Sequence, residues 1–141
     1  MGCATVLCVD DSPQALKLRK AALESCGYHV EIASSGSAAM RMLKRVSVAA
    51  IVLEYKLEGM DAEAAACHIK RQFPSVPVIL LSAFSEIPER ILWLVDECVM
   101  KRGIPEGLIP VLQRIAGTES ADGVHKLAPR SPDEQGYRGD A

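Results

Sequence analysis

The sequence is poor in aromatic residues and has no long hydrophobic run. Phe, Tyr and Trp make up only 4% of its 141 residues, so a core must be built mainly from Ala, Val, Leu and Ile. No apolar stretch approaches the roughly 20 residues that a membrane-spanning helix needs. The first residues, MGCATVLCVDD, lack the charged start and apolar run of a signal peptide. We therefore expect a soluble, cytoplasmic protein with no membrane partner.

The chain also lacks paired cysteines and a strong excess of either charge. Its five cysteines contain no Cys-x-x-Cys motif and have no His nearby at ligand spacing, which predicts reduced thiols: Cys3, Cys8, Cys26, Cys67 and Cys98. A formal net charge of -2 argues against a nucleic-acid partner bound through a broad basic surface. Neither a glycine-rich phosphate loop nor a nucleophilic triad is recognisable.

What the chain does have is an alternation of short apolar runs and helical patterns. Strands are predicted at 5–9, 28–33, 49–53, 78–82 and 98–100, and helices near 13–26, 36–45, 62–73, 86–95 and 105–116. Five such pairs predict an α/β fold with a parallel sheet, right-handed crossovers and helices on both faces. Pro110 lies inside the last helical pattern, so that helix is expected to kink or to start late.

The domain is expected to end before the chain does. We assign residues 1–117 to one domain, because residues 118–141 are polar, contain Pro and Gly, and show no periodicity. That composition predicts a disordered tail.

Two helices need an assignment of faces. For the first helix, helical spacing suggests a buried side formed by Ala15, Leu18, Ala22 and Cys26. The run Ile91–Val95 is apolar in every direction, so we expect a short helix sunk into the fold with Trp93 in the core. The alternative is an exposed patch for self-association or for a partner.

Polar residues follow four of the predicted strands. Because ligands of such sheets bind at the carboxyl ends of the strands, we group these residues as the strand-end cluster: Asp10, Asp11, Glu54, Ser82 and Lys101. Carboxylates brought together need a cation between them, and oxygen ligands suit Mg²⁺. A hydroxyl and an ammonium beside them suit phosphoryl oxygens. Each residue alone could be a turn former, a helix cap or a solvated charge; together they indicate a site.

These residues resemble the motifs of a known family. VLCVDDSP, VLEYKLEGMD, LLSA and MK, in this order, are similar to the receiver domain of two-component response regulators, the CheY-like family, over Thr5 to about Ala116. The resemblance implies a flavodoxin-like sheet of order 2-1-3-4-5. It implies Mg²⁺ ligands at Asp10, Asp11 and the backbone carbonyl of Lys56. It also implies phosphoryl contacts at Ser82 and Lys101.

Glu54 falls where the family has the aspartate that accepts phosphate from a histidine kinase. Glu is longer than Asp by one methylene, about 1.3 Å of reach, which misplaces the carboxylate for phosphoryl transfer. The longer arm carries its charge toward Ser82 and Lys101 and partly imitates a phosphoryl group. Cys98 replaces the family's switch aromatic, and Arg102 replaces the proline after the lysine.

We therefore expect a stand-alone, non-enzymatic receiver-like domain of a phosphorelay that acts by docking onto signalling proteins. It is expected to be impaired in phosphorylation or constitutively phospho-mimetic. Three alternatives remain open: an ordinary Mg²⁺-dependent phosphoacceptor, a Mg²⁺-dependent α/β phosphoryl-transfer enzyme, and a scaffold whose strand-end cluster is vestigial.

Overall fold

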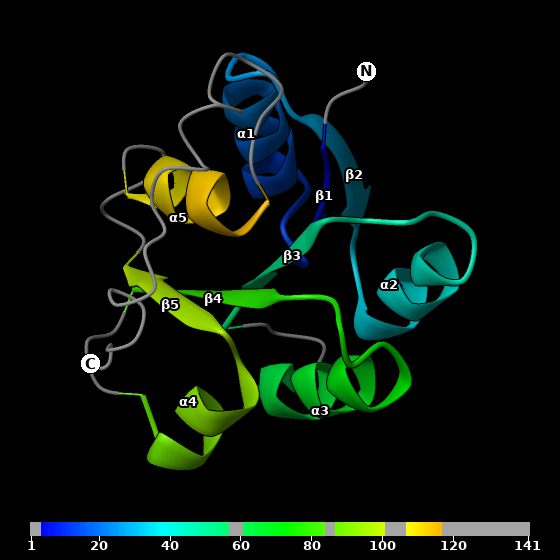
Figure 1. The fold of residues 1–141 in the computed structure, drawn as a ribbon, viewed down its shortest axis with the longest axis vertical. Helices are drawn as coiled ribbons and strands as arrows, with labels where there is room; N and C mark the ends of the chain where they lie inside the picture. The colour runs from blue at the N-terminus through cyan, green and yellow to red at the C-terminus, as the bar shows by residue number, and fades with distance from the viewer. Residues whose placement is uncertain (1–3, 57–60, 84–86, 101–106, 117–141) are drawn as a thin grey trace.

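The computed structural model describes residues 4–56, 61–83, 87–100 and 107–116. Five strands alternate with five helices along the chain (Figure 1): β1 Thr5–Val9, α1 Pro13–Glu24, β2 His29–Ala33, α2 Gly36–Leu43, β3 Ala50–Glu54, α3 Ala62–Gln72, β4 Val78–Ser82, α4 Glu89–Leu94, β5 Glu97–Met100 and α5 Leu108–Ile115. The predicted alternation is confirmed. The predicted tail at 118–141 lies outside the described residues.

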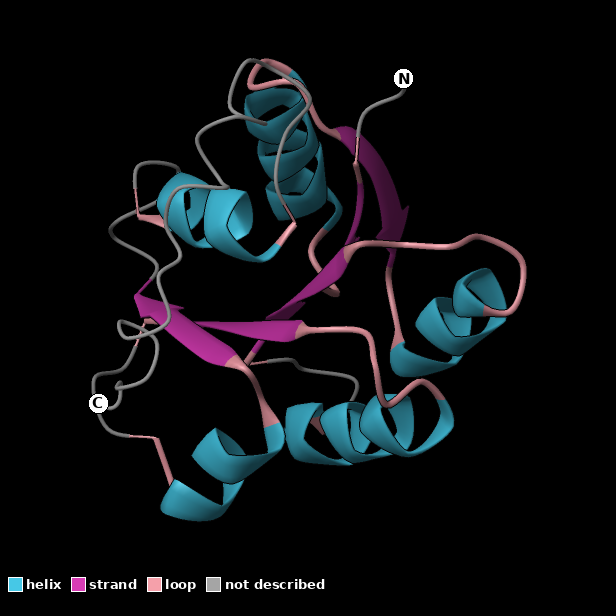
Figure 2. Cartoon of the chain, in the orientation of Figure 1, coloured by secondary structure: helices cyan, strands magenta, loops and turns pink. Residues whose placement is uncertain are grey.

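The strands form one parallel sheet in the order β2-β1-β3-β4-β5, as the resemblance implied (Figure 2). The central strands β3 and β4 are buried along their whole length, whereas β2 alternates between buried and more exposed residues at one edge. This difference matches their sequences, because strands covered on both faces are continuously apolar.

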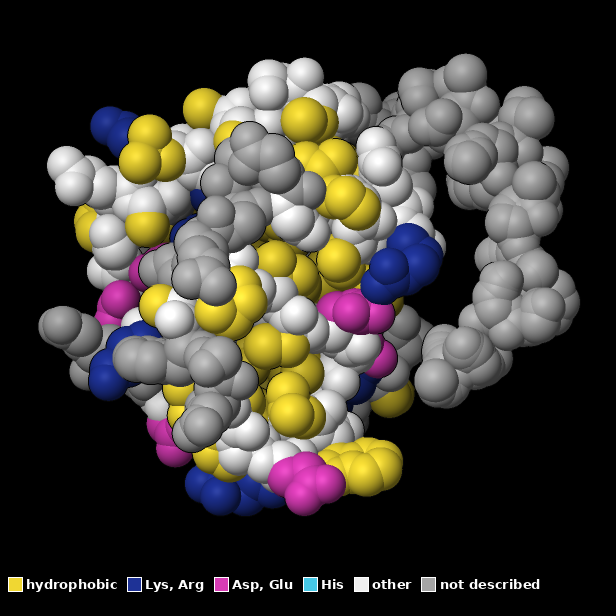
Figure 3. All heavy atoms as spheres, turned by 90° about the vertical axis from the view of Figure 1, so that its left-hand side faces the viewer, with side chains coloured by type: hydrophobic (Ala, Val, Ile, Leu, Met, Phe, Trp, Pro, Cys, Tyr) yellow, Lys and Arg dark blue, Asp and Glu magenta, His cyan; other side chains and the backbone are white. Residues whose placement is uncertain are grey.

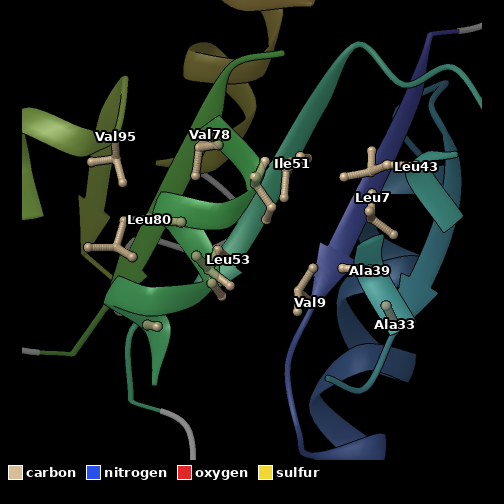
Figure 4. Packing of buried hydrophobic residues seen from close by; sticks show 14 of the residues in the cluster. Leu7, Val9, Ala33, Ala39, Leu43, Ile51, Leu53, Val78, Leu80 and Val95 are labelled. Carbon is tan, nitrogen blue, oxygen red and sulfur yellow. The ribbon is translucent and has the colours of Figure 1, made fainter. Parts of the chain in front are cut away.

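Helices cover the two faces of the sheet unequally. One hydrophobic cluster lies between the sheet and α2, α3 and α4, and Figure 4 shows residues of it, such as Leu7, Leu53 and Leu80, packed side by side. The other lies between the sheet and α1 and α5 and includes Leu23, Ile79 and Leu112. Successive strand residues point to opposite faces, so each inner strand contributes to both clusters.

Helix α1 begins where its sequence predicts and ends at Glu24, two residues earlier than predicted. The Ser12 hydroxyl accepts a hydrogen bond from the Ala15 N–H at 3.2 Å, and Pro13 occupies the first helical position. Gly27, just past the helix, has a φ of 99°, a backbone conformation that glycine adopts without steric cost.

The predicted buried side of α1 is wrong in its details. Leu18 is 73% exposed and Cys26 is exposed, whereas the residues buried against the sheet are Leu16, Arg19 and Leu23. The helix is therefore rotated relative to the prediction, and a cation lies on its buried face.

The prediction for α4 is also corrected. Trp93 is 81% exposed and is not part of the core, and Leu92 is 44% exposed. The buried residues of this segment are Ile91 and Val95, which are 3% and 9% exposed. Ile91 and Val95 are four residues apart and turn toward the sheet, because a short helix at the surface has one inner face.

Helix α5 starts late, as Pro110 indicated. The helix begins at Leu108, so Pro110 lies in the first turn, where backbone N–H groups have no intrahelical acceptor in any case. None of the helices in the described ranges is long and apolar enough to cross a membrane.

Candidate functional site

The interior of the described residues contains four polar or charged side chains: Asp10, Arg19, Glu54 and Ser82. Three of them belong to the predicted strand-end cluster. Asp10 directly follows β1, Glu54 is the last residue of β3, and Ser82 is the last residue of β4. Buried polar groups are costly unless they are satisfied, so their concentration at one end of the sheet marks this end as the candidate site.

The strand register brings these positions together. Val9 of β1 pairs with Leu53 of β3, so Asp10 and Glu54 each come one residue after a paired position on neighbouring strands (Figure 4 labels Val9 and Leu53). Glu54 itself pairs with Leu81, one residue before Ser82. Neighbouring strands lie about 4.8 Å apart, and the three side chains therefore share one edge of the sheet.

Asp10 is held by two partners and is 3% exposed. Its Oδ1 accepts a hydrogen bond from the Ser12 N–H at 3.0 Å, and its Oδ2 accepts one from Nη1 of Arg19 at 3.3 Å. The Arg19 side chain is 6% exposed, so this ion pair is buried on both sides. Both carboxylate oxygens of Asp10 are thus engaged by the protein itself.

Glu54 is 2% exposed and bonds to the turn that follows it. Its Oε2 accepts a hydrogen bond from the Lys56 N–H at 3.0 Å. The hydrogen bond from the Tyr55 N–H to the Leu81 carbonyl, 2.8 Å, continues the β3–β4 pairing past Glu54. The carboxylate is therefore anchored in a rigid surrounding.

The remaining predicted site residues are placed less completely. Asp11 is partly exposed beside Asp10, and Lys56 is exposed after β3. Ser82 is fully buried and pairs in register with Met100, the last residue of β5. Lys101 and Arg102 lie outside the described residues, while Cys98 is an exposed residue of β5.

The predicted magnesium ligands can be compared with the arrangement of the described residues. Carboxylate oxygens are the right kind of donor, but the described ranges contain no group of three or more His, Cys, Asp or Glu side chains placed to hold a metal ion. In addition, a guanidinium lies 3.3 Å from Oδ2 of Asp10. A divalent cation at Asp10 would have to share that carboxylate with Arg19.

The sheet and its polar carboxyl edge define a flavodoxin-like α/β protein of the CheY-like class. The chain belongs to the response regulator receiver domain family, whose model matches residues 6–104. This family consists of signalling domains of two-component systems.

Curated relatives of this chain include bacterial transcriptional regulators. The transcriptional regulatory protein GlrR of Escherichia coli K12 is 36% identical over 88 residues, which cover 62% of this chain and 20% of that protein. The probable transcriptional regulatory protein TcrX of Mycobacterium tuberculosis is 31% identical over 90 residues, covering 64% of this chain and 38% of that protein. The chain thus spans about a fifth of the length of GlrR.

Solved structures agree with the fold. The response regulator TrrA of Thermotoga maritima, determined in complex with Mg²⁺-BeF, has a TM-score of 0.73 and 25% identity, covering 79% of this chain and 98% of that chain. TrrA also occurs in a complex with the histidine kinase ThkA. The chemotaxis protein CheY4 of Vibrio cholerae matches with a TM-score of 0.73 and 24% identity, covering 79% of this chain and 98% of that chain.

Sequence reasoning missed Arg19. The signal was present, because Leu16, Arg19 and Leu23 are spaced by three and four residues and so share one face of a helix. With Leu18 as a core position, the predicted buried face of α1 is rotated about the helix axis by one residue, or about 100°. Arg19 then lies on the predicted solvent side.

Proposed function

We propose that this receiver domain docks onto signalling proteins of a two-component pathway and responds weakly or not at all to phosphorylation. The observation that supports this most directly is the position of Glu54: a buried carboxylate at the end of β3, held by the Lys56 N–H. Membership of the receiver family favours this function over the alternative of a phosphoryl-transfer enzyme.

Glu54 is poorly suited to accept a phosphoryl group. Phosphoryl transfer depends on positioning, and the additional methylene extends the carboxylate by about 1.3 Å relative to Asp. The same extension places a permanent negative charge where a phosphorylated aspartate would develop one. This mimicry is partial, since a carboxylate carries one charge and a phosphoryl group about -1.5 to -2.

The proposal assigns roles to the other members of the strand-end cluster. Ser82 and Lys101 would face the Glu54 carboxylate, and Asp10, Asp11 and the Lys56 carbonyl would supply oxygen atoms for Mg²⁺. Metal binding at this site is expected to be weak. The partner kinase is proposed by analogy with TrrA, which occurs in a complex with ThkA.

A phosphodonor experiment tests the proposal. The wild type, Glu54→Asp and Glu54→Gln are incubated with acetyl phosphate and Mg²⁺ and analysed by intact mass. We expect no phosphoryl adduct on the wild type or Glu54→Gln, and a gain on Glu54→Asp, whose shorter side chain restores the ordinary acceptor.

The outcome for the wild type decides between the proposal and its main alternative. A robust adduct on the wild type that Glu54→Gln abolishes would show an ordinary phosphoacceptor with Glu54 as the modified residue. An adduct that persists in Glu54→Gln would place the modification on another acid, which peptide mapping identifies.

A further inference from the structure

Among the residues that the structure describes, Arg19 is the one buried polar residue that the strand-end prediction does not explain. It lies between Leu16 and Leu23 on the face of α1 that packs on the sheet, and it is 6% exposed. Burying a guanidinium there is costly, and an Ala, Leu or Met at this position would form the helix equally well. Its partner, Asp10, is itself 3% exposed and belongs to the strand-end cluster.

The Arg19–Asp10 pair lacks the two-hydrogen-bond geometry of an optimised arginine–carboxylate ion pair. One nitrogen, Nη1, contacts one oxygen, Oδ2, at 3.3 Å, whereas arginine pairs optimally through two parallel hydrogen bonds. The Nε of Arg19 is buried and has no hydrogen-bond partner among the described residues. The pair therefore balances charge but leaves part of the guanidinium unsatisfied.

Buried carboxylates at this end of the sheet need a cation near them. Asp10 and Glu54 are buried carboxylates on neighbouring strands, and like charges in one site repel unless a cation lies near them. Arg19 supplies a cation from within the chain. A magnesium ion at Asp10 would be repelled by the guanidinium and would find Oδ2 already engaged.

We propose that Arg19 replaces the divalent cation as the counter-ion of Asp10, so that the Asp10 carboxylate is neutralised without metal and binds Mg²⁺ only when Arg19 is displaced. Arg19 is thus a positioning residue that sets the metal affinity of the site. The inference rests on the proposed function, since it concerns the same cluster, and it gives a reason for weak metal binding that is independent of Glu54.

Thermal unfolding with and without Mg²⁺ tests this inference. Removing Arg19 leaves Asp10 buried without its counter-ion and lowers the melting temperature in the absence of metal. Saturating Mg²⁺ is then expected to raise the melting temperature of Arg19→Met by about 5 °C or more, because a ligand that binds only the folded state stabilises it. The wild type is expected to shift by less than about 1 °C.

Matched variants separate this effect from general electrostatics. Lys17→Met removes one positive charge from the exposed face of the same helix and should behave like the wild type. Arg19→Gln keeps a hydrogen-bond donor but no charge and should respond to Mg²⁺ as Arg19→Met does. The double variant Asp10→Asn with Arg19→Met should lose the response. NaCl at equal ionic strength controls for screening.

A purely structural ion pair predicts the opposite result. The inference is overturned when Mg²⁺ fails to stabilise Arg19→Met and Arg19→Gln beyond the NaCl control, or when the wild type shifts as much as they do. If both variants are unfolded without metal, circular dichroism must show that Mg²⁺ refolds them. Variants that stay unfolded in Mg²⁺ also overturn the inference. No phosphorylation is measured, so a phosphorylated wild type would contradict the proposed function and leave this result standing.

Discussion

At the scale of single residues, the buried carboxylates of this domain satisfy themselves locally. Asp10 accepts from the Ser12 N–H and Glu54 from the Lys56 N–H, each two residues further along the chain and each at 3.0 Å. In both cases a backbone N–H of the following turn donates to a carboxylate oxygen. Asp10 also pairs with Arg19, a buried residue of α1.

Cys8 provides a prediction about reactivity at this scale. It is a fully buried residue of β1, and burial raises the pKa of its thiol from 9.0 to about 12. Smaller effects come from Arg19, which lowers this pKa, and from Asp10, which raises it. At about pH 8 a thiol reagent should label the exposed Cys26 in the native protein and reach Cys8 only after unfolding. Cys8→Ala should leave native labelling unchanged and lower the denatured count by one.

The pH dependence follows from the direction of that pKa shift. Between the unfolded value of 9.0 and the folded value of about 12, the folded state keeps a proton that the unfolded state has lost. The Cys8 contribution to stability is therefore complete below pH 9.0 and is lost as the pH rises through this window. Unfolding of the wild type and Cys8→Ala at increasing alkaline pH measures it, and rapid native labelling of Cys8 would contradict the burial.

At the scale of elements, the six-residue helix α4 carries both a buried and two exposed hydrophobic side chains. Ile91 packs into the hydrophobic cluster that lies between the sheet and α2, α3 and α4, while Leu92 and Trp93 face outward. Arg90 forms an ion pair with Glu63 at 3.0 Å, which ties α4 to α3, and this hydrogen bond raises the pKa of Arg90. Figure 3 shows the side of the molecule where α4, β5 and α5 lie, with hydrophobic side chains gathered across it.

The exposure of Trp93 predicts its fluorescence. Because Trp93 is the sole tryptophan and is 81% exposed, its emission maximum should lie near that of free tryptophan, with ready quenching by acrylamide. Trp93→Ala should change the free energy of unfolding by no more than about 0.5 kcal/mol. Ile91→Ala, which opens a cavity in the core, should cost about 2–5 kcal/mol.

Self-association through residues 91–95 stays a prediction and can be read in the same experiment. If two copies meet at this region, Trp93 emission shifts to shorter wavelength as the protein concentration rises. Emission that is independent of concentration, together with a monomeric mass by light scattering, would argue against it.

At the scale of the whole molecule, the sheet divides the interior into two hydrophobic layers. Ile69 of α3 lies in the layer with α2 and α4, and Ile79 of β4 lies in the layer with α1 and α5. Both are almost completely buried, at 1% and 0% exposure. The sheet lies between the two layers, so side chains of one layer make little direct contact with those of the other.

The two layers should therefore respond independently to mutation. Ile69→Val and Ile79→Val are each expected to cost about 0.5–1.5 kcal/mol of unfolding free energy. The double variant should equal their sum within about 0.5 kcal/mol, since distant sites without shared partners are additive. Urea unfolding of the four proteins measures this, and a larger coupling would mean that the layers communicate through β4.

Most elements of this protein could be predicted from local sequence. The apolar runs identified all five strands, Ser12 and Ser35 cap α1 and α2 as their residue type suggests, and Gly27 follows α1. Sheet order came from the resemblance, because the adjacency of β1 and β3 depends on contacts between residues far apart in the chain. Val9 and Leu53, for example, pair across 44 positions of sequence.

Local sequence alone determined where the strands end, and hence that Asp10, Glu54 and Ser82 lie at one edge, because parallel strands place their carboxyl ends together. The faces of the short helices were decided only by the tertiary structure. Whether Leu18 or Arg19 turns inward on α1, and whether Trp93 is covered on α4, depends on which neighbour each helix packs against. Hydrophobicity favours burying Leu18 and Trp93. The sheet instead buries Arg19, because Asp10 lies within reach of its guanidinium.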